Sequence, residues 1–408
     1  MGEVTVIIFH PAAAKEDGPL ASKPAGSVRP PSVVGPDGSA GPDGSVERDS
    51  SAGPLSATLA AARDALAAAH AERFRRAGAA AVRIDRRPVG ASFGQRLAEV
   101  AAALPPADGL VVLGAGSVPR LRLADARRLV AAAAGPAPQA LTNNRYSSDV
   151  CAIARAAETL AGLPVLPGDN ALPRWLAERA GVEVRELPGR ERLAADIDSP
   201  LDLALLGLLP RPPAVLRPWT GTLAVPHLAE LRAVLADPRA ELLVAGRASS
   251  RGLAVLERTA ACRIRFLSEE RGLRASSPLA QADPRSAASP PAARGQATHP
   301  ARHPRSVLGR LLEARGGPSA LAAAVAELAD AAIIDSRVFL ADRLGADERR
   351  WPDPEDRYAS DLLRPEAVTD PWLRALTASA ASSAVPIVLG GHSLVGPGLA
   401  LLVGARMA

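Results

Sequence analysis

Short apolar runs alternate along the chain with longer stretches in which apolar residues recur at helical spacing. Residues 3–9 (EVTVIIF) and 108–116 (DGLVVLGAG) predict strands, whereas residues 55–78 repeat Ala and Leu with the period of a helix. Residues 148–162 (SDVCAIARAAETLAG) also predict a helix. Because strands alternate with helices as far as residue 208, we expect an α/β fold with a mainly parallel sheet in three layers.

A Pro-rich segment separates this first block from a second one. Residues 209–218 (LPRPPAVLRP) predict a linker, and residues 219–408 again alternate helices and strands, so we expect a second, Rossmann-like α/β domain. Two segments are rich in Pro, Gly, Ala or Ser: residues 10–54, where GPDGS occurs twice, and residues 275–305. Such compositions bury little apolar surface, which predicts a flexible insertion at 10–54 within a domain spanning 1–208, and a low-complexity insertion in the second domain.

Composition narrows the classes of function. Aromatic residues make up 3% of the chain, too few for a surface that stacks nucleobases, and the net charge of +5 comes without a dense Lys/Arg run. Cys151 and Cys262 lie far apart, which excludes a disulfide framework and a CxxC site. Residues 1–10 lack the pattern of a signal peptide, and no apolar run is long enough to span a membrane. We therefore expect a cytoplasmic protein that binds neither nucleic acid nor membrane, and the sequence does not indicate its oligomeric state.

Two carboxylates, two residues apart, form the first candidate site. Asp196 and Asp198 lie in the segment AADIDSPLDL and would project from the same face of a strand. Such a pair at a strand end suits Mg²⁺, which prefers oxygen ligands and often bridges substrate phosphates. A structural role is the alternative, because Ser199, Pro200 and Asp202 fit the start of a helix with a capping box. The two interpretations are compatible.

Two further candidates lie in turns that follow predicted strands of the first block. Asn143, Asn144 and Arg145 could bind a nucleotide, because amides can read the edge of a nucleobase and Arg can hold a phosphate. A polar turn is the alternative interpretation. Gly116 and Ser117 follow the strand that begins at residue 108, and small residues there let a ligand approach the backbone closely. For these two residues, a plain tight turn is equally consistent with the pattern.

The second block offers a glycine-rich loop after its last predicted strand. Backbone N–H groups in such a loop can bind an anion, and a neighbouring His and Ser could take part in acid–base or nucleophilic chemistry. A glycine-rich connection without function is the alternative. Elsewhere in this block, a strand predicted over residues 331–340 would place Asp335 and Arg337 on one face as an ion pair. The candidate residues of the loop are Gly390, Gly391, His392 and Ser393.

Four segments, taken in order along the chain, resemble a known family. They are DGLVVLGAGSVPRLRLADARRLVAAA, LTNNRYSSDVCAI, PGDNALPRWLAERAGVEV and LAADIDSPLDLALL. Together they resemble the nucleotidyltransferases that make dinucleotide-type cofactors, such as 2-phospho-L-lactate guanylyltransferase and the molybdenum-cofactor guanylyltransferases. The resemblance covers residues 1–208 and implies a nucleotide-diphospho-sugar-transferase-like fold. It also implies guanylyl transfer from a nucleoside triphosphate, with Mg²⁺ as the cofactor and a small nucleotide or phosphorylated metabolite as the partner.

The chain departs from the family pattern at three places. The family's Asp-x-Pro turn supplies a metal-binding Asp, whereas Ser117 stands there in GSVP. The family has a Gly-rich loop after the first strand, where this chain has its insertion, and Arg174 and Trp175 lie where the family has a His. The resemblance then leaves Asp196 and Asp198 as metal ligands. Three hypotheses stay open. The chain is a nucleotidyltransferase of cofactor biosynthesis, or it is a non-catalytic nucleotide- or metabolite-binding regulatory protein that lost its metal centre. The third places the activity in the second block, at residues 388–398, with the first domain as a scaffold.

Overall fold

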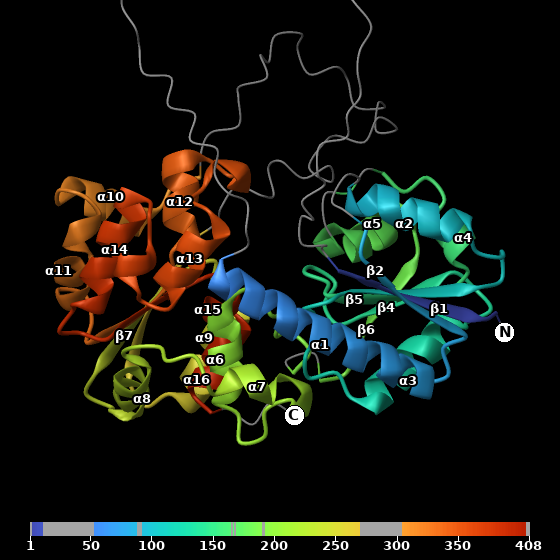
Figure 1. Ribbon diagram of the computed structural model, residues 1–408, viewed down its shortest axis with the longest axis horizontal. Helices are drawn as coiled ribbons and strands as arrows, with labels where there is room; N and C mark the ends of the chain where they lie inside the picture. The colour runs from blue at the N-terminus through green and yellow to red at the C-terminus, as the bar shows by residue number, and fades with distance from the viewer. Residues whose placement is uncertain are drawn as a thin grey trace, which may run out of the picture.

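The structure is a computed structural model that describes residues 2–10, 53–87, 92–164, 166, 169–189, 192–269 and 304–404. Within these residues the strands form one sheet of six and one of four, with helices around each (Figure 1). This arrangement confirms the predicted α/β class. The predicted insertions at 10–54 and 275–305 lie almost wholly outside the described residues.

The first sheet has the strand order β2-β1-β3-β5-β4-β6. β5 runs antiparallel to its neighbours β3 and β4, whereas the other neighbouring pairs are parallel. The sheet is therefore mixed, with most of its pairs parallel as predicted. Its strands are β1 (Val4–Phe9), β2 (Ala81–Asp85), β3 (Gly109–Gly114), β4 (Gln139–Thr142), β5 (Val150–Ile153) and β6 (Glu183–Glu186).

The helix predicted over residues 148–162 is wrong in its first half, because β5 occupies Val150–Ile153. All four side chains of β5 are buried, and Cys151 is paired with β3 on one side and with β4 on the other. Only the short helix α4 (Ala156–Thr159) follows. A short apolar run suits a buried strand as well as a helix. Residues 150–153 form a strand because they lie in the centre of the sheet, with hydrogen-bonded strands on both sides.

Helices cover both faces of the first sheet and so give the three layers that the pattern predicts (Figure 1). Side chains alternate along a strand, so β1 contributes to both faces. Val6 and Ile8 pack with Phe74 and its neighbours in one cluster, whereas Ile7 packs with Leu97 in another. The first cluster is covered by α1 (Pro54–Arg76) and α3 (Leu123–Ala133), and the second by α2 (Phe93–Ala102), α4 and α5 (Leu172–Glu178).

The second sheet is parallel throughout and has the order β10-β9-β7-β8. Its strands are β7 (Glu241–Gly246), β8 (Arg263–Ser268), β9 (Ala331–Asp335) and β10 (Ile387–Gly390). The surrounding helices are α8 (Leu228–Ala236), α9 (Ser250–Thr259), α10 (Val307–Ala314), α11 (Leu321–Ala326), α12 (Arg337–Leu344), α13 (Pro354–Asp361), α14 (Pro371–Ala381), α15 (His392–Val395) and α16 (Pro397–Leu402).

Elements of the first block also pack into the core around the second sheet. Leu59 of α1 and Leu203 of α6 (Pro200–Gly207) belong to the same buried cluster as Leu242 of β7 and Ile333 of β9. Figure 1 shows α1 running from this cluster to the underside of the first sheet. The helical turn α7 (Arg217–Thr220) occupies the end of the segment predicted as a linker. The boundary predicted at residue 208 stays a prediction, and the two blocks share a core.

The N-terminus of α1 is capped by a carboxylate from the far end of the chain. Leu55 N and Ser56 N donate to the two oxygens of Glu355 at 2.8 and 2.9 Å, and the Ser56 hydroxyl donates at 2.7 Å. The N-cap residue, Gly53, has no side chain that could accept these bonds. Glu355 of α13 therefore satisfies N–H groups that a helix start leaves open, in the positive region of the helix dipole.

We expect Glu355→Ala to lower the free energy of unfolding by about 1–2 kcal/mol, the usual cost of losing a helix cap. Urea unfolding of the full chain measures the change. Glu366→Ala is the matched control, because Glu366 is exposed in the same part of the chain and is expected to change stability by less than about 0.5 kcal/mol. Equal losses in the two variants would show that the contact with α1 contributes nothing.

Candidate functional site

A cavity of about 710 Å³ lies where the carboxyl ends of strands from the two sheets face each other. Its size is in the range of small-molecule sites, and ligands of open α/β sheets bind beyond the carboxyl ends of the strands. One wall follows β1, β3 and β4, and the other is formed by α9, α15 and α16. Of the predicted site residues, the cavity brings together Gly116, Ser117, Asn144, Asp196, Asp198, His392 and Ser393.

The turn after β3 forms part of the first wall and is joined to the Asp196 segment. Ser117 and Asp196 form an antiparallel bridge, and Ile197 N donates to Gly116 O at 3.0 Å. A side chain at Gly116 would lie 2.8 Å from Ile197 O, so the close approach of the two segments requires glycine here. The strand predicted to carry Asp196 and Asp198 is therefore reduced to this single bridge, and the turn holds Asp196 at the cavity.

A buried histidine holds the same turn from behind. His70 of α1 is fully buried, and its Nε2 lies 2.9 Å from Ser117 O while its Nδ1 lies 2.9 Å from Arg73 Nη1. Since the guanidinium can only donate, Nδ1 accepts and Nε2 carries the proton that it donates to the carbonyl. Burial, followed by the charge of Arg73, lowers the pKa of His70 to about 4. The ring is therefore neutral at pH 7 and acts as a structural donor.

Four carboxylates face the cavity from the first wall: Asp149, Asp169, Asp196 and Asp198. Burial raises the pKa of Asp196, and the charges of Asp198 and Asp149 raise it further. Burial likewise raises the pKa of Asp149, and raises that of Asp169 to about 6, with neighbouring carboxylates adding to both. Arg63 of α1 opposes this charge only in part, because its Nη2 lies 3.8 Å from Asp198 while its Nε donates to Ile197 O. The wall therefore gathers more carboxyl groups than it has positive charges to balance them.

The predicted triplet at 143–145 divides into three roles. Asn143 is buried and positions Asp149, because its Nδ2 donates to Asp149 Oδ2 at 2.7 Å and its Oδ1 accepts from Asp149 N at 3.0 Å. Asn144 lines the cavity, and its Oδ1 accepts from Tyr146 N. Arg145 is not among the lining residues, and its backbone N–H donates to Glu186.

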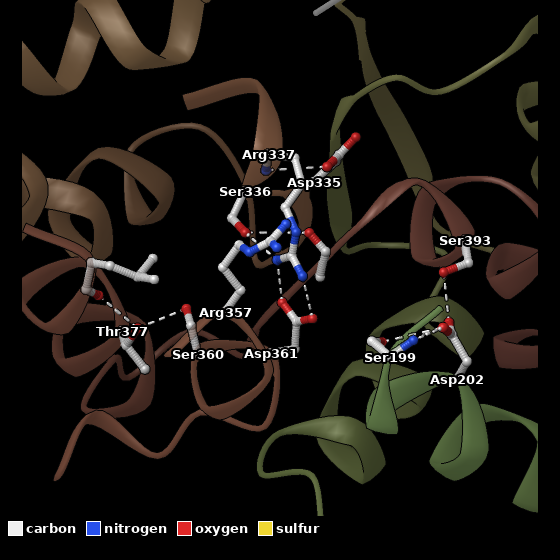
Figure 2. Close-up of polar contacts among 12 residues, drawn as sticks. Ser199, Asp202, Asp335, Ser336, Arg337, Arg357, Ser360, Asp361, Thr377 and Ser393 are labelled. Atoms are coloured by element: carbon white, nitrogen blue, oxygen red, sulfur yellow. Dashed lines mark hydrogen bonds and ion pairs between the residues drawn. The ribbon is translucent and has the colours of Figure 1, made fainter. Parts of the chain in front are cut away.

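The helix start predicted after Asp198 is confirmed, and it joins the two blocks. Ser199 is the N-cap residue of α6, and Asp202 Oδ2 accepts from the backbone N–H groups of Asp198 and Ser199. Figure 2 shows the Ser393 hydroxyl, from α15, pointing at the other oxygen of Asp202, to which it donates at 2.6 Å. Burial, followed by the charge of Asp198, raises the pKa of Asp202 to about 7. The acidic segment and the C-terminal loop thus meet at one buried carboxylate.

The second wall carries two arginines that sequence reasoning missed. Arg251 and Arg258 of α9 line the cavity together with Val255 between them. Positions four and seven residues apart lie on one face of a helix, and this spacing directly after the buried strand β7 was the available signal. From the predicted loop, His392 and Ser393 line the cavity. Gly391 is not among the lining residues.

The glycine at the end of β10 has a packing role. A Cβ atom at position 390 would lie 2.8 Å from the side chains of Leu201 and Leu394. Because glycine has no Cβ, α6 and α15 can approach the strand closely here. Gly390 is not among the residues that line the cavity. Of the candidate residues of the predicted anion-binding loop, only His392 and Ser393 line the cavity.

Asp335 and Arg337 do not lie on one strand as predicted. β9 ends at Asp335 and α12 begins at Arg337, so the two side chains take different partners. Arg337 binds Asp361 of α13 through two parallel hydrogen bonds (Figure 2), whereas Asp335 pairs with Arg247. The Arg247–Asp335 pair joins the carboxyl ends of the neighbouring strands β7 and β9, whereas the Arg337–Asp361 pair joins α12 and α13.

Two kinds of feature are absent from the described residues: a cluster of three or more metal-binding side chains, and a membrane-spanning helix. Among them, no group of three or more His, Cys, Asp or Glu side chains is placed to hold a metal ion. No helix in the described part is both long and apolar enough to cross a membrane. No protein-family model, no curated protein and no solved structure matches the chain.

Proposed function

We propose that the first wall of the cavity binds a nucleoside triphosphate, or another small phosphorylated metabolite, together with Mg²⁺, and that the chain is a diverged nucleotidyltransferase-like protein. The observation that supports this is the group of four carboxylates around one cavity. Burial, with the charge of neighbouring carboxylates, raises the pKa values of Asp149, Asp169 and Asp196. A divalent cation would relieve the repulsion between these groups. Raised pKa values in a cleft are typical of functional sites.

The carboxylates fit Mg²⁺ in the way that this ion is usually held. Mg²⁺ in phosphate-transfer sites is bound by one or two carboxylates, and waters and substrate phosphates complete its octahedron. Asp196 and Asp198 would be the protein ligands, which agrees with the lack of a larger ligand group in the described residues. The cation would hold the phosphates against this wall and neutralise charge that develops on them.

The asparagine beside the acids suits a base with a carbonyl group. Asn144 Oδ1 already accepts one hydrogen bond, from Tyr146 N, so the two N–H groups of the amide are the larger part of what it can offer a ligand. Donors match the O6 acceptor of guanine better than the amino group of adenine. This supports guanylyl transfer as the specific form of the proposal.

The alternative is a non-catalytic binding or regulatory protein, and Ser117 is the residue that favours it. A neutral hydroxyl replaces the carboxylate that the resembled family has in this turn, and the loss of one charged ligand weakens a metal centre. Asp149 and Asp169, however, bring two further carboxylates to the same wall. We therefore favour the catalytic hypothesis, in which the negative charges of these two residues replace the charge that the turn at Ser117 lacks.

We expect the full chain to bind GTP at least tenfold more tightly with Mg²⁺ than without it, as measured by isothermal titration calorimetry, and to bind ATP more weakly. Asp196→Asn should remove the effect of Mg²⁺, because the amide is neutral. This variant should fold, since the carboxylate it replaces is destabilised by burial and by its neighbours. Asp237→Asn is the control, because Asp237 accepts from Arg239 far from the cavity.

The two hypotheses predict different results in this experiment. No affinity for GTP, CTP or ATP under any condition would contradict the proposal. Binding that ignores Mg²⁺ and survives Asp196→Asn would favour the non-catalytic alternative. A catalytic role further predicts that pyrophosphate is released when acceptor and GTP are both present, because the acceptor oxygen bonds to the α-phosphorus and the bond to the β-phosphate breaks.

A further inference from the structure

The two walls of the cavity differ in the sign of their charge. The first wall carries Asp149, Asp169, Asp196 and Asp198, and the second carries Arg251 and Arg258 on one face of α9. Arginine stays protonated at every physiological pH, so the second wall is positive whatever the state of the acids. One cavity therefore offers two environments, one suited to a cation and one suited to an anion.

The helix that carries the arginines is held firmly against the rest of the second block. Ser249 caps α9 by accepting from Gly252 N at 3.2 Å, and a side chain at Gly252 would lie 3.1 Å from Leu399 of α16. The close contact of the two helices fixes the face that α9 turns to the cavity. Arg251 lies in the first turn of α9, so the positive end of the helix dipole adds to the charge of its guanidinium group.

Val255 separates the arginines and gives the second wall an apolar centre. Pro397 and Ala400 of α16 also line the cavity. A ligand bound here would need an oxyanion group for the guanidinium groups and a small apolar part beside Val255. Guanidinium groups bind carboxylate and phosphate oxygens through paired hydrogen bonds, so both groups satisfy this wall.

We propose that Arg251 and Arg258 form a second subsite, which binds the phosphate or carboxylate group of a small acceptor molecule. The inference rests on the proposed function, because the nucleotide and its cation occupy the acidic wall and leave the basic wall for the second substrate. It gives the second block a task that the first block lacks: the choice of the acceptor. The volume of about 710 Å³ accommodates both ligands.

The subsite can be tested without nucleotide. With EDTA present, the ³¹P linewidth of inorganic phosphate is titrated against the full chain, and malonate is added as a competitor to compare a carboxylate with a phosphate. We expect phosphate to bind in the millimolar range or tighter. Arg251→Gln and Arg258→Gln should each weaken binding about tenfold, and the double variant should abolish it. Arg258→Lys should weaken binding less than Arg258→Gln does, because it keeps the charge but loses the paired hydrogen bonds.

Two control variants separate this subsite from general charge effects and from the nucleotide site. Arg232→Gln removes an exposed charge from α8, outside the cavity, and should leave phosphate binding unchanged. Asp196→Asn should leave it unchanged or strengthen it. Circular dichroism checks that each variant is folded.

Three outcomes would overturn the inference. The first is that the wild-type chain binds neither phosphate nor malonate. The second is that Arg232→Gln reduces binding as much as the α9 variants do. The third is that the α9 variants weaken Mg²⁺–GTP binding as strongly as phosphate binding, which would assign these arginines to the nucleotide. Phosphate binding that depends on α9, in a chain without affinity for any nucleotide, would instead retain the subsite and contradict the proposed nucleotide site.

Discussion

Arg337→Met is expected to lower the free energy of unfolding of the full chain by about 3–5 kcal/mol, the usual cost of breaking a buried ion pair by removing one partner. Arg337 is 7% exposed and Asp361 is 0% exposed, and two hydrogen bonds of 2.5 and 2.7 Å join them. Methionine matches the length of the arginine stem but cannot donate. The variant therefore leaves the Asp361 carboxylate buried without its two donors.

The neighbouring charges make this loss larger. Burial alone would raise the pKa of Asp335, but Arg247 and then Arg337 hold it below its ordinary value. Burial raises the pKa of Asp361 even with Arg337 present, so the carboxylate depends on that guanidinium to stay charged. Removing Arg337 takes a stabilising charge from both acids. Equilibrium unfolding in urea, with a single transition checked by fluorescence and circular dichroism, measures the result.

Two further variants test the cause of the loss. Arg310→Met breaks an ion pair with Asp342 in which the arginine side chain is 64% exposed, and it should cost at most about 1 kcal/mol. Arg337→Met combined with Asp361→Leu should recover a large part of the stability, because the buried carboxylate is then gone. A loss from Arg337→Met no greater than that from Arg310→Met would contradict the argument.

The same residues show where sequence reasoning succeeds and where it stops. The run AAIID predicts a buried strand correctly, because a short run of consecutive apolar residues suits the centre of a parallel sheet. The sequence does not show that the strand ends at Asp335. Pairing with β10 determines that end, since the ladder stops where Gly390 lies opposite Asp335. Arg337 then starts a helix and turns to Asp361, far along the chain in α13.

The candidate site follows the same division. Local patterns predicted Asp196, Asp198 and the capped helix of Ser199 and Asp202, because carboxylate spacing and caps depend on residues a few positions apart. Each of the residues that were missed lies in an ordinary turn or helix, and only the packing of two blocks brings them to one cavity. They are Asp149, Asp169, Arg251 and Arg258. Localisation, nucleotide and metal stay predictions.

His70→Gln is expected to make the chain more resistant to acid than the wild type, by about 3 kcal/mol at pH 4. The pKa of His70 is lowered from 6.5 to about 4, first by burial and then by Arg73. The unfolded chain therefore binds a proton between pH 6.5 and pH 4 that the folded chain refuses. The stability that the neutral ring contributes is complete above pH 6.5 and is lost as the pH falls from 6.5 to 4.

Glutamine can keep both contacts without titrating. Its amide nitrogen can donate to Ser117 O and its amide oxygen can accept from Arg73, as Nε2 and Nδ1 of the ring do. The variant should therefore match the wild type within about 1 kcal/mol at pH 7.5, the size of one hydrogen bond. The turn that carries Ser117 should keep its place beside Asp196.

The comparison must be made between the two proteins at each pH, because other groups act in the opposite direction. The pKa values of Asp169 and Asp202 are raised, to about 6 and about 7. The folded chain therefore holds these protons more tightly than the unfolded chain does, and the stability that they contribute is lost as the pH rises from 4 to 7. Their effect is the same in both proteins and cancels in the difference of unfolding free energies. His227→Gln controls for the replacement itself, since that ring contacts the single carbonyl of Ala381. A difference between His70→Gln and wild type that stays constant from pH 7.5 to pH 4 would show that His70 is already accessible to protons in the folded chain, and that the turn at Ser117 is not sealed from behind.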